Sequence, residues 1–383
     1  MNPIYLDYNA TTPTDPRVVE SMLPWLRGEA GNPSSGHAWG RRSRAAVTAA
    51  REQVAALLGC RPGEVVFTSG GSEACNHAVK GSAFARQNDG RHLVVSVIEH
   101  PAVTEAAQWL ARRGWRCDRL PVTPNGLVEP RALAAALQPD TVLVSVMHAN
   151  NETGVVQPLA ELADRLRGRQ SWLYADCAQS AGKIPLRVRE LGVDLASIAG
   201  HKLYAPKGVG ALYVRAGLRL DNLIHGAGQE DGRRAGTEAV AQVVGLGAAC
   251  ARAADLLARE TEQLAVLRDE LAARLQAQIP GAVIHGRNAP RLPNTLSIAL
   301  PGCPAAAVLE HLREKLAASA GAACHGHAAH VSSVLAAMGV ADELALATIR
   351  FSVGRFTTLQ DVENAATLVV ETSRQVGTAG PAA

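Results

Sequence analysis

The alternation of short β-rich runs with helical stretches between residues 64 and 215 most constrains how this chain can fold. The predicted strands are short, and most of them are apolar. They cover residues 64–68, 93–98, 116–121, 141–147, 172–175, 195–199 and 210–214. Amphipathic helical segments at 103–113, 131–137 and 159–167 lie between them. This alternation predicts an α/β fold with a largely parallel sheet covered on both faces by helices.

The remainder of the chain predicts a second, smaller α/β lobe. A long run rich in Ala, Leu, Glu and Arg at 238–278 predicts one or two helices that join the lobes. After it come strand-like segments and two further helices. The strands are predicted at 282–285, 295–299 and 348–353, and the helices at 305–315 and 359–376.

Composition limits the classes of function. The 383 residues are 47% apolar, as expected for a soluble globular enzyme, and the net charge is only +3. That balance gives no reason to expect nucleic acid or a membrane as a partner. We find neither an apolar stretch of about 18 residues nor a signal peptide pattern at the start. Seven scattered cysteines without a Cys-x-x-Cys pair disfavour a disulfide framework, so we expect a reduced, cytoplasmic setting.

Two chemically distinctive residues follow neighbouring predicted strands. Asp176 closes one apolar strand, and Lys202 follows the next. Ligands of parallel sheets bind at the carboxyl ends of the strands, so both side chains can face one crevice. A carboxylate and a reactive amine suit pyridoxal phosphate, which needs a lysine Schiff base and an acidic partner for its ring nitrogen. The alternative is an exposed lysine after an edge strand.

Other strand ends carry further candidate residues. Gly70-Gly71-Ser72 follows a strand and opens a helix, where glycines and free amides favour a phosphate, although a plain turn has the same pattern. His100 ends another strand and is either a ring-stacking residue or an ordinary polar terminus. Residues 150–154, which include Asn151, offer amide donors at the same sheet edge. Several such segments together indicate a binding site.

A glycine- and alanine-rich segment at 320–330 carries Cys324. The small residues predict a mobile loop that can carry its thiol some distance. Nearby histidines would raise the thiolate fraction if they were protonated. The alternative is a metal site formed by Cys324, His325, His327 and His330, although adjacent ligands rarely point to one ion.

Two arginine-containing segments suggest anion binding. Arg350 lies inside an apolar strand pattern, where a guanidinium needs a partner, either a substrate carboxylate or a structural salt bridge. The glycine-flanked basic loop at 232–237 can donate to a phosphate, in its own subunit or across a dimer.

Taken together, these segments resemble the cysteine desulfurases of the NifS/IscS type, which belong to class V of the aminotransferase-fold pyridoxal phosphate enzymes, and are close to the selenocysteine lyases. The resemblance spans nearly the whole chain. Its motifs lie at 5–13, 31–35, 70–73, 99–100, 150–154, 176–179, 200–202, 234–237 and 350–355, together with Cys324.

The resemblance implies fold type I, with a large domain of residues 16–256 around a mainly parallel seven-stranded sheet. Residues 1–15 and 257–383 would form a small domain that carries the cysteine loop. It also implies a homodimer, L-cysteine or L-selenocysteine as substrate, and a sulfur-acceptor protein in pathways such as iron–sulfur cluster assembly. Neither a membrane nor direct nucleic-acid binding is expected.

The resemblance also implies roles for individual residues. Lys202 would hold pyridoxal phosphate, Asp176 would pair with its ring nitrogen, and His100 would stack on the ring. Cys324 would accept the sulfur, and Arg350 would hold the substrate carboxylate. The remaining cofactor contacts implied by the family are Gly71, Ser72, Asn151, Gln179, His201 and, from the second subunit, Thr237. Asn151 would also lie near the substrate carboxylate.

Some positions depart from the usual desulfurase pattern. Ala199 stands where many desulfurases have a serine, and the histidines around Cys324 replace small or hydroxyl residues. The Ala-Cys-His start of that loop and Gln229-Glu230 look more like selenocysteine lyase, whereas Pro101 is frequent in NifS-like desulfurases. We therefore expect a cysteine desulfurase, with selenocysteine lyase as the alternative and a non-catalytic metal-binding scaffold as a remote one.

Overall fold

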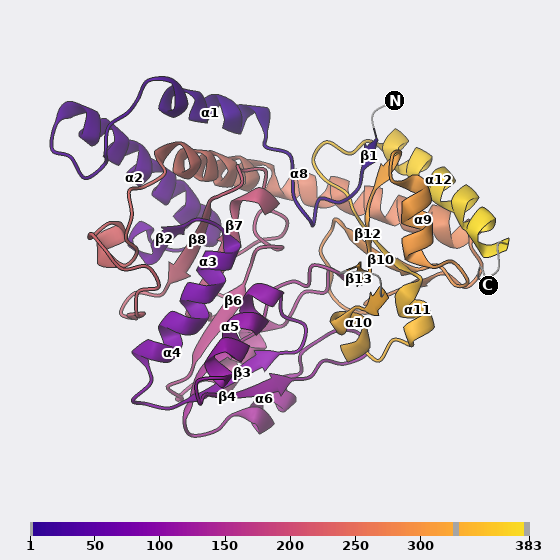
Figure 1. Cartoon of the computed structure of the whole chain (residues 1–383), viewed down its shortest axis with the longest axis horizontal. Coiled ribbons are helices and arrows are strands. Elements are labelled where there is room, and N and C mark those ends of the chain that lie inside the picture. The colour runs from indigo at the N-terminus through magenta and orange to yellow at the C-terminus, as the bar shows by residue number, and fades with distance from the viewer. Residues whose placement is uncertain (1–2, 325–328, 379–383) are drawn as a thin grey trace.

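The computed structural model describes residues 3–324 and 329–378, with all side chains except those of 322–324, 329–330 and 377–378. Figure 1 shows a large portion built around a central sheet and a smaller portion that includes both β1 (Ile4–Tyr5) and α12 (Leu359–Thr378). Helix α8 (Val240–Gln278) runs from one portion into the other. It forms one continuous helix, where the sequence allowed one or two.

The central sheet has seven strands in the order β2-β8-β7-β6-β5-β3-β4. All strand pairs from β4 to β7 are parallel, whereas β8 pairs antiparallel with both of its neighbours. The predicted mainly parallel sheet is therefore confirmed. Its strands are β2 (Val65–Thr68), β3 (His92–Ser96), β4 (Arg116–Leu120), β5 (Thr141–Ser145), β6 (Trp172–Asp176), β7 (Leu195–Ala199) and β8 (Gly210–Val214).

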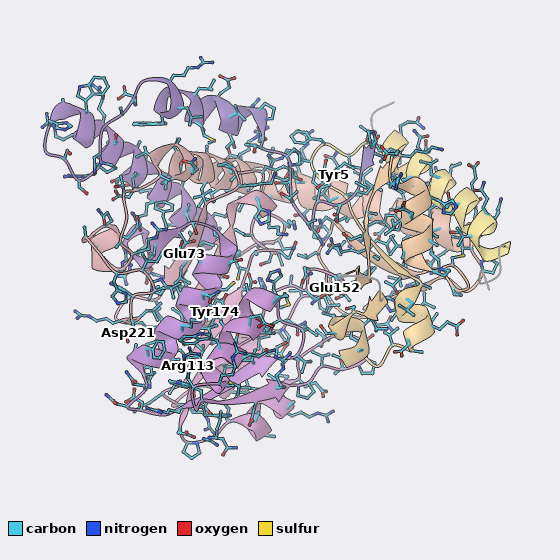
Figure 2. All side chains as sticks on the ribbon, in the orientation of Figure 1. Tyr5, Glu73, Arg113, Glu152, Tyr174 and Asp221 are labelled. Carbon is cyan, nitrogen blue, oxygen red and sulfur yellow. The ribbon has the colours of Figure 1, made fainter. Side chains whose placement is uncertain are left out.

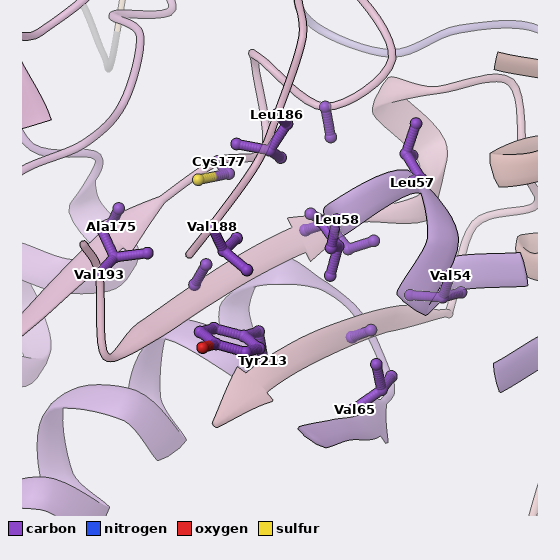
Figure 3. Close-up of a cluster of buried hydrophobic side chains, with 14 of the residues drawn as sticks. Val54, Leu57, Leu58, Val65, Ala175, Cys177, Leu186, Val188, Val193 and Tyr213 are labelled. Atoms are coloured by element: carbon purple, nitrogen blue, oxygen red, sulfur yellow. The ribbon is translucent and has the colours of Figure 1, made fainter. Parts of the chain in front are cut away.

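Helices cover both faces of this sheet because successive strand side chains point to opposite sides. In β2, Val65 and Phe67 join one apolar cluster and Val66 joins the other. Figure 3 shows part of the first cluster, to which α2 (Ala38–Leu58) contributes Leu58 and β8 contributes Tyr213. The helices on that side are α1 (Pro16–Arg27), α2 (Ala38–Leu58), α6 (Pro130–Ala136), α7 (Leu159–Arg165) and the first half of α8. The other side carries α3 (Gly71–Asn76), a π-helical stretch (His77–Gly81), α4 (Ser82–Ala85) and α5 (Pro101–Ala111).

Helix α8 contributes to the apolar cores of both portions. Side chains up to Ala253 pack in the cluster beneath the large sheet, and those from Leu264 onward pack in the cluster of the smaller portion. By length and composition alone α8 would also suit a membrane span, a test that core helices of globular proteins pass as well. The domain boundary predicted at residue 256 falls inside this helix and stays a prediction.

The smaller portion is built on an antiparallel sheet of order β12-β15-β10-β9. Its strands are β9 (Val283–Ile284), β10 (Thr295–Ala299), β12 (Ser319–Ala320) and β15 (Thr348–Ser352). The N-terminal strand β1 (Ile4–Tyr5) pairs with β11 (Leu316–Ala317), so the start of the chain packs here. Helices α9 (Ala305–Leu312), α10 (Ser333–Ala337), α11 (Asp342–Leu346) and α12 (Leu359–Thr378) complete this portion.

Candidate active site

A cavity of about 780 Å³ opens at the carboxyl ends of the parallel strands. The segments that follow β2, β3, β5, β6 and β7 form its walls, as expected for a parallel sheet. The N-terminal segment around Asn9 and strand β15 close it from the side of the smaller portion. Most of the predicted site residues line this cavity. They are Gly71, Ser72, His100, Asn151, Asp176, Gln179, His201, Lys202 and Arg350.

Lys202 reaches the cavity from a short turn directly after β7. Its Nζ donates to the backbone oxygens of Asn9, at 2.5 Å, and Ala10, at 2.7 Å. Burial, followed by the nearby Arg350 cation, lowers the pKa of Lys202 to about 8, against the opposing pull of Asp176. An amine with a pKa this low is neutral in a useful fraction of molecules near neutral pH, so it can act as a nucleophile.

Asp176 lies buried at the end of β6. Its Oδ1 accepts hydrogen bonds from Ala178 N at 2.9 Å and from Ser197 Oγ at 3.2 Å. The neighbouring Glu99 is also buried, and burial together with the charge of Asp176 raises the pKa of Glu99 to about 8. Glu99 is therefore mostly protonated at neutral pH and adds little negative charge beside Asp176. The sequence motif included Glu99 but did not indicate this coupling.

His100 is the N-cap of α5. Its Nδ1 accepts a hydrogen bond from Ala102 N at 3.1 Å, which places the proton of the neutral ring on Nε2. Burial is the main cause that lowers the pKa of His100, and the Lys202 cation acts in the same direction. The structure therefore presents an uncharged imidazole to the cavity.

The opposite end of the cavity is suited to an anion. Gly70 has φ +145°, a conformation open to glycine, and Gly71 begins α3, whose first-turn amides lack intrahelical acceptors. A Cβ on Gly71 would lie only 3.0 Å from the Cβ of Ala199, so both small residues allow the helix to approach β7. His201 lies nearby with its pKa lowered to about 4, mainly by burial.

Glu73 on α3 binds one arginine of the basic loop at 232–237. Its carboxylate accepts two hydrogen bonds from Arg234, at 2.9 and 3.0 Å. Figure 2 shows Glu73 near the start of α3. Arg234 of the basic loop is therefore engaged by a carboxylate, and the phosphate contact suggested for the loop as a whole stays a prediction. Thr237 of the same loop is exposed and lies outside the large cavity of its own chain.

Arg350 is buried on β15 and faces the cavity from the smaller portion. Its Nη2 donates to Asp7 Oδ1 at 2.7 Å and to Ser319 Oγ at 2.8 Å, and its Nη1 donates to Asn151 O at 3.2 Å. Among the described residues, the Nε atom is buried without a hydrogen-bond partner. The structural salt bridge is present, with Asp7, and the contact with a substrate carboxylate stays a prediction.

Two site residues were not singled out from the sequence. Asn9 is buried between the two portions, where its side chain bonds to Asn151 O at 3.1 Å and Thr295 Oγ1 at 2.8 Å. Lys183 is also buried and donates to Gln179 Oε1 at 2.8 Å. Asn9 lies within the sequence motif at 5–13, but its hydrogen-bond partners and those of Lys183 could not be read from the sequence, since only long-range packing brings these groups together.

Cys324 belongs to a hairpin of β13 (Ala322–Cys324) and β14 (Ala329–Val331), in which its backbone pairs with that of Ala329. Its side chain lies outside the described residues, as do His325, His327 and the side chain of His330. The predicted role of Cys324 and the metal-site alternative therefore stay predictions.

The sequence pattern described as aminotransferase class V matches residues 4–365. The chain belongs to the class V aminotransferase family. A relative named cysteine desulfurase IscS, from Dictyoglomus turgidum, is 43% identical over 360 residues, which cover 94% of this chain and 91% of the relative. The family resemblance and the fold class predicted from the sequence are thereby confirmed.

Solved structures of similar proteins agree with this family assignment. A structure described as a NifS-like protein matches this class V chain with a TM-score of 0.90 at 34% identity, and covers 96% of this chain and 98% of its own. The structure of SspA in complex with cysteine matches with a TM-score of 0.82 at 33% identity, and covers 92% of this chain and 99% of its own.

Proposed function

We propose that this chain is a pyridoxal phosphate-dependent cysteine desulfurase. It converts L-cysteine to L-alanine and transfers the sulfur to Cys324 as a persulfide, from which an acceptor protein takes it. The observation that carries this proposal is the convergence of the Lys202 amine and the Asp176 carboxylate on one cavity. Relatives named cysteine desulfurase, 41–44% identical over nearly the whole chain, support the same activity.

The residues present fit pyridoxal phosphate. Lys202, with its lowered pKa, suits the aldehyde, and buried Asp176 suits the ring nitrogen. The uncharged His100 ring offers a face for stacking, while Gly71 and Ser72 offer amides to the phosphate. When bound, the coenzyme supplies an electron sink for the carbanion formed from the substrate.

The protein groups supply binding and proton transfer. Arg350, with its unpaired Nε, would hold the substrate carboxylate. The Lys202 amine would remove the α-proton, and neutral Glu99 would leave Asp176 as the dominant negative charge beside the ring. The Cys324 thiolate would attack the substrate sulfur. The carbon–sulfur bond would break with its electron pair left on the β-carbon, which takes up a proton, while a sulfur–sulfur bond forms on Cys324 and L-alanine leaves.

A Cys324→Ala variant tests the proposal. We expect it to keep the visible absorbance of the coenzyme and to lose persulfide formation and alanine release from L-cysteine. Cys303→Ala is the matched control, because Cys303 is a buried cysteine of the smaller portion. Undiminished desulfuration by Cys324→Ala would remove Cys324 from its assigned role.

L-Cysteine is the favoured substrate over L-selenocysteine. The relatives are named cysteine desulfurases, and the matching SspA structure is described in complex with cysteine. Rates of alanine release from both amino acids measure the preference directly. A preference for L-selenocysteine by many orders of magnitude would overturn the choice.

We also propose a cytoplasmic homodimer in which Thr237 contacts the coenzyme of the other subunit and a sulfur-acceptor protein docks nearby. Exposed Thr237 outside its own cavity supports this arrangement, as do the exposed apolar side chains of Leu26 and Trp39. Iron–sulfur cluster assembly is the pathway suggested by the IscS relatives. Sedimentation of the purified protein tests the dimer, and a monomer with full activity would contradict it.

A further inference from the structure

Lys183 is a buried lysine that the mechanism above does not use. It lies in the turn after β6 with only 7% of its surface exposed. Its Nζ donates to Gln179 Oε1 at 2.8 Å and to Asn9 Oδ1 at 3.3 Å. Burial, followed by the nearby cations Lys202 and Arg350, lowers the pKa of Lys183 to about 7, so both its protonated and its neutral form are present near neutral pH. Burying an amine costs free energy unless nearby groups form hydrogen bonds with it.

The Gln179 side-chain amide is one of the groups that form such a hydrogen bond with Lys183. An amide can adopt two orientations that exchange its oxygen and its NH₂ group. Lys183 Nζ donates to the amide oxygen at 2.8 Å, and its protonated form has no acceptor to offer, so the amide oxygen faces Lys183. Asn9 O can only accept, and Gln179 Nε2 donates to it at 3.0 Å. The two partners therefore select the same orientation.

This orientation has a consequence for the cavity that Gln179 lines. One of the two N–H groups of Nε2 serves Asn9 O, and the second stays available for a ligand. A flipped amide would instead offer an oxygen acceptor and repel an anionic oxygen. In its protonated form Lys183 also polarises the amide so that the positive end of the amide points away from Lys183.

We propose that Lys183 is a positioning residue that holds the Gln179 amide with its NH₂ group available to an anionic oxygen of the bound coenzyme. This inference rests on the proposed function, because it assumes that pyridoxal phosphate occupies the cavity. Lys183 itself does not line the cavity and acts through Gln179.

A double-mutant cycle tests the inference. Lys183→Met, Gln179→Met and the double variant are titrated with pyridoxal phosphate at pH 7, and both the dissociation constant and the visible absorption maximum are recorded. We expect each single variant to bind roughly five-fold more weakly and to shift the maximum, as the loss of one hydrogen bond predicts. In the Gln179→Met background, Lys183→Met should change neither quantity by a comparable amount.

Controls separate this effect from general destabilisation. Lys80→Met removes a lysine that stacks on Trp109, away from the cavity, and should match the wild type. If Lys183→Met does not fold, Lys183→Arg replaces it. That variant keeps the donors, so the absorption maximum should remain unchanged, and a shift would contradict the inference.

The outcomes distinguish the two proposals. A wild-type protein that takes up no pyridoxal phosphate overturns the proposed function and this inference together. If the wild type binds the coenzyme and the Lys183→Met variant has the same affinity and absorption maximum, only the inference about Lys183 is overturned. Independent, additive effects of Lys183 and Gln179 also overturn it.

Discussion

Burial and neighbouring charges set the pKa values of the ionisable residues in and around the cavity. Lys202 has a pKa lowered to about 8 because it is buried near Arg350, and Glu99 has a pKa raised to about 8 because it is buried near Asp176. The sequence placed Lys202 and Asp176 at one sheet edge, since both follow neighbouring strands. The sequence did not indicate that the pKa of Glu99 is raised, because the burial of Glu99 beside Asp176 is a property of the packed molecule.

The pKa of Lys202 predicts the pH dependence of coenzyme uptake. Only the neutral amine reacts, and at pH 7 about a tenth of Lys202 is neutral. The rate at which the coenzyme-free protein combines with pyridoxal phosphate should therefore rise with pH and level off above a midpoint near 8. Stopped-flow absorbance measures this rate. Arg350→Met should move the midpoint upward, whereas a wild-type midpoint near 10 would contradict the assignment.

The raised pKa of Glu99 predicts a pH-dependent gain in stability for Glu99→Gln. The folded state holds the Glu99 proton more tightly than the unfolded state, so the wild type loses stability as the pH rises from about 4.5 to 8. Glutamine does not titrate. The variant should therefore gain about 1–3 kcal/mol relative to wild type between pH 5 and pH 8. Urea unfolding at both pH values measures this difference, and equal differences at both would count against a neutral Glu99.

At the level of elements, the chain just after the β13–β14 hairpin is bonded to the loop that follows β5. Ser332 directly follows β14 and is the N-cap of α10, where its hydroxyl accepts from Val334 N and Leu335 N. The same hydroxyl donates to Glu152 Oε2 at 2.5 Å, on the loop after β5. Figure 2 shows Glu152 in the region between the large portion and α10. Burial raises the pKa of Glu152.

Ser332→Ala should lower the free energy of unfolding by about 1–2 kcal/mol, because it removes both the helix cap and the partner of Glu152. Ser333→Ala is the matched control, since Ser333 is exposed and lies one position further along. Urea unfolding monitored by circular dichroism compares the two. A loss of the same size in both variants would contradict the role of Ser332.

At the level of the whole molecule, Arg355 connects distant parts of the chain. Its guanidinium donates to Asp15 Oδ2 and Glu260 Oε1, each at 2.5 Å, and stacks over the Tyr204 ring at 4.1 Å. Asp15 precedes α1, Glu260 lies in the middle of α8, and Tyr204 follows Lys202. This buried ion group therefore holds the start of the chain, the long helix and the site turn together.

Arg355→Met should destabilise the protein by about 3–5 kcal/mol, because it leaves two buried carboxylates without their cation. Arg313→Met removes an arginine from an exposed pair with Glu310 and should cost about 0–1 kcal/mol. Thermal unfolding of both variants provides the comparison. A mild effect of Arg355→Met would show that the two carboxylates find other partners.

The amino-acid sequence determined the α/β class, the seven strands of the large sheet and the strand-end residues of the cavity. Periodicity and strand-end motifs are local properties, so they survive in a single sequence. The helices between residues 16 and 58 also carry local signals that our prediction did not use, such as Asp15 before Pro16 and Gly59 after Leu58. The partners of Asn9 and the buried state of Lys183 were decided by the tertiary structure. Hydrogen bonds such as Lys183 to Asn9 join residues far apart in the chain. Only packing brings such groups out of water and sets their pKa values and orientations.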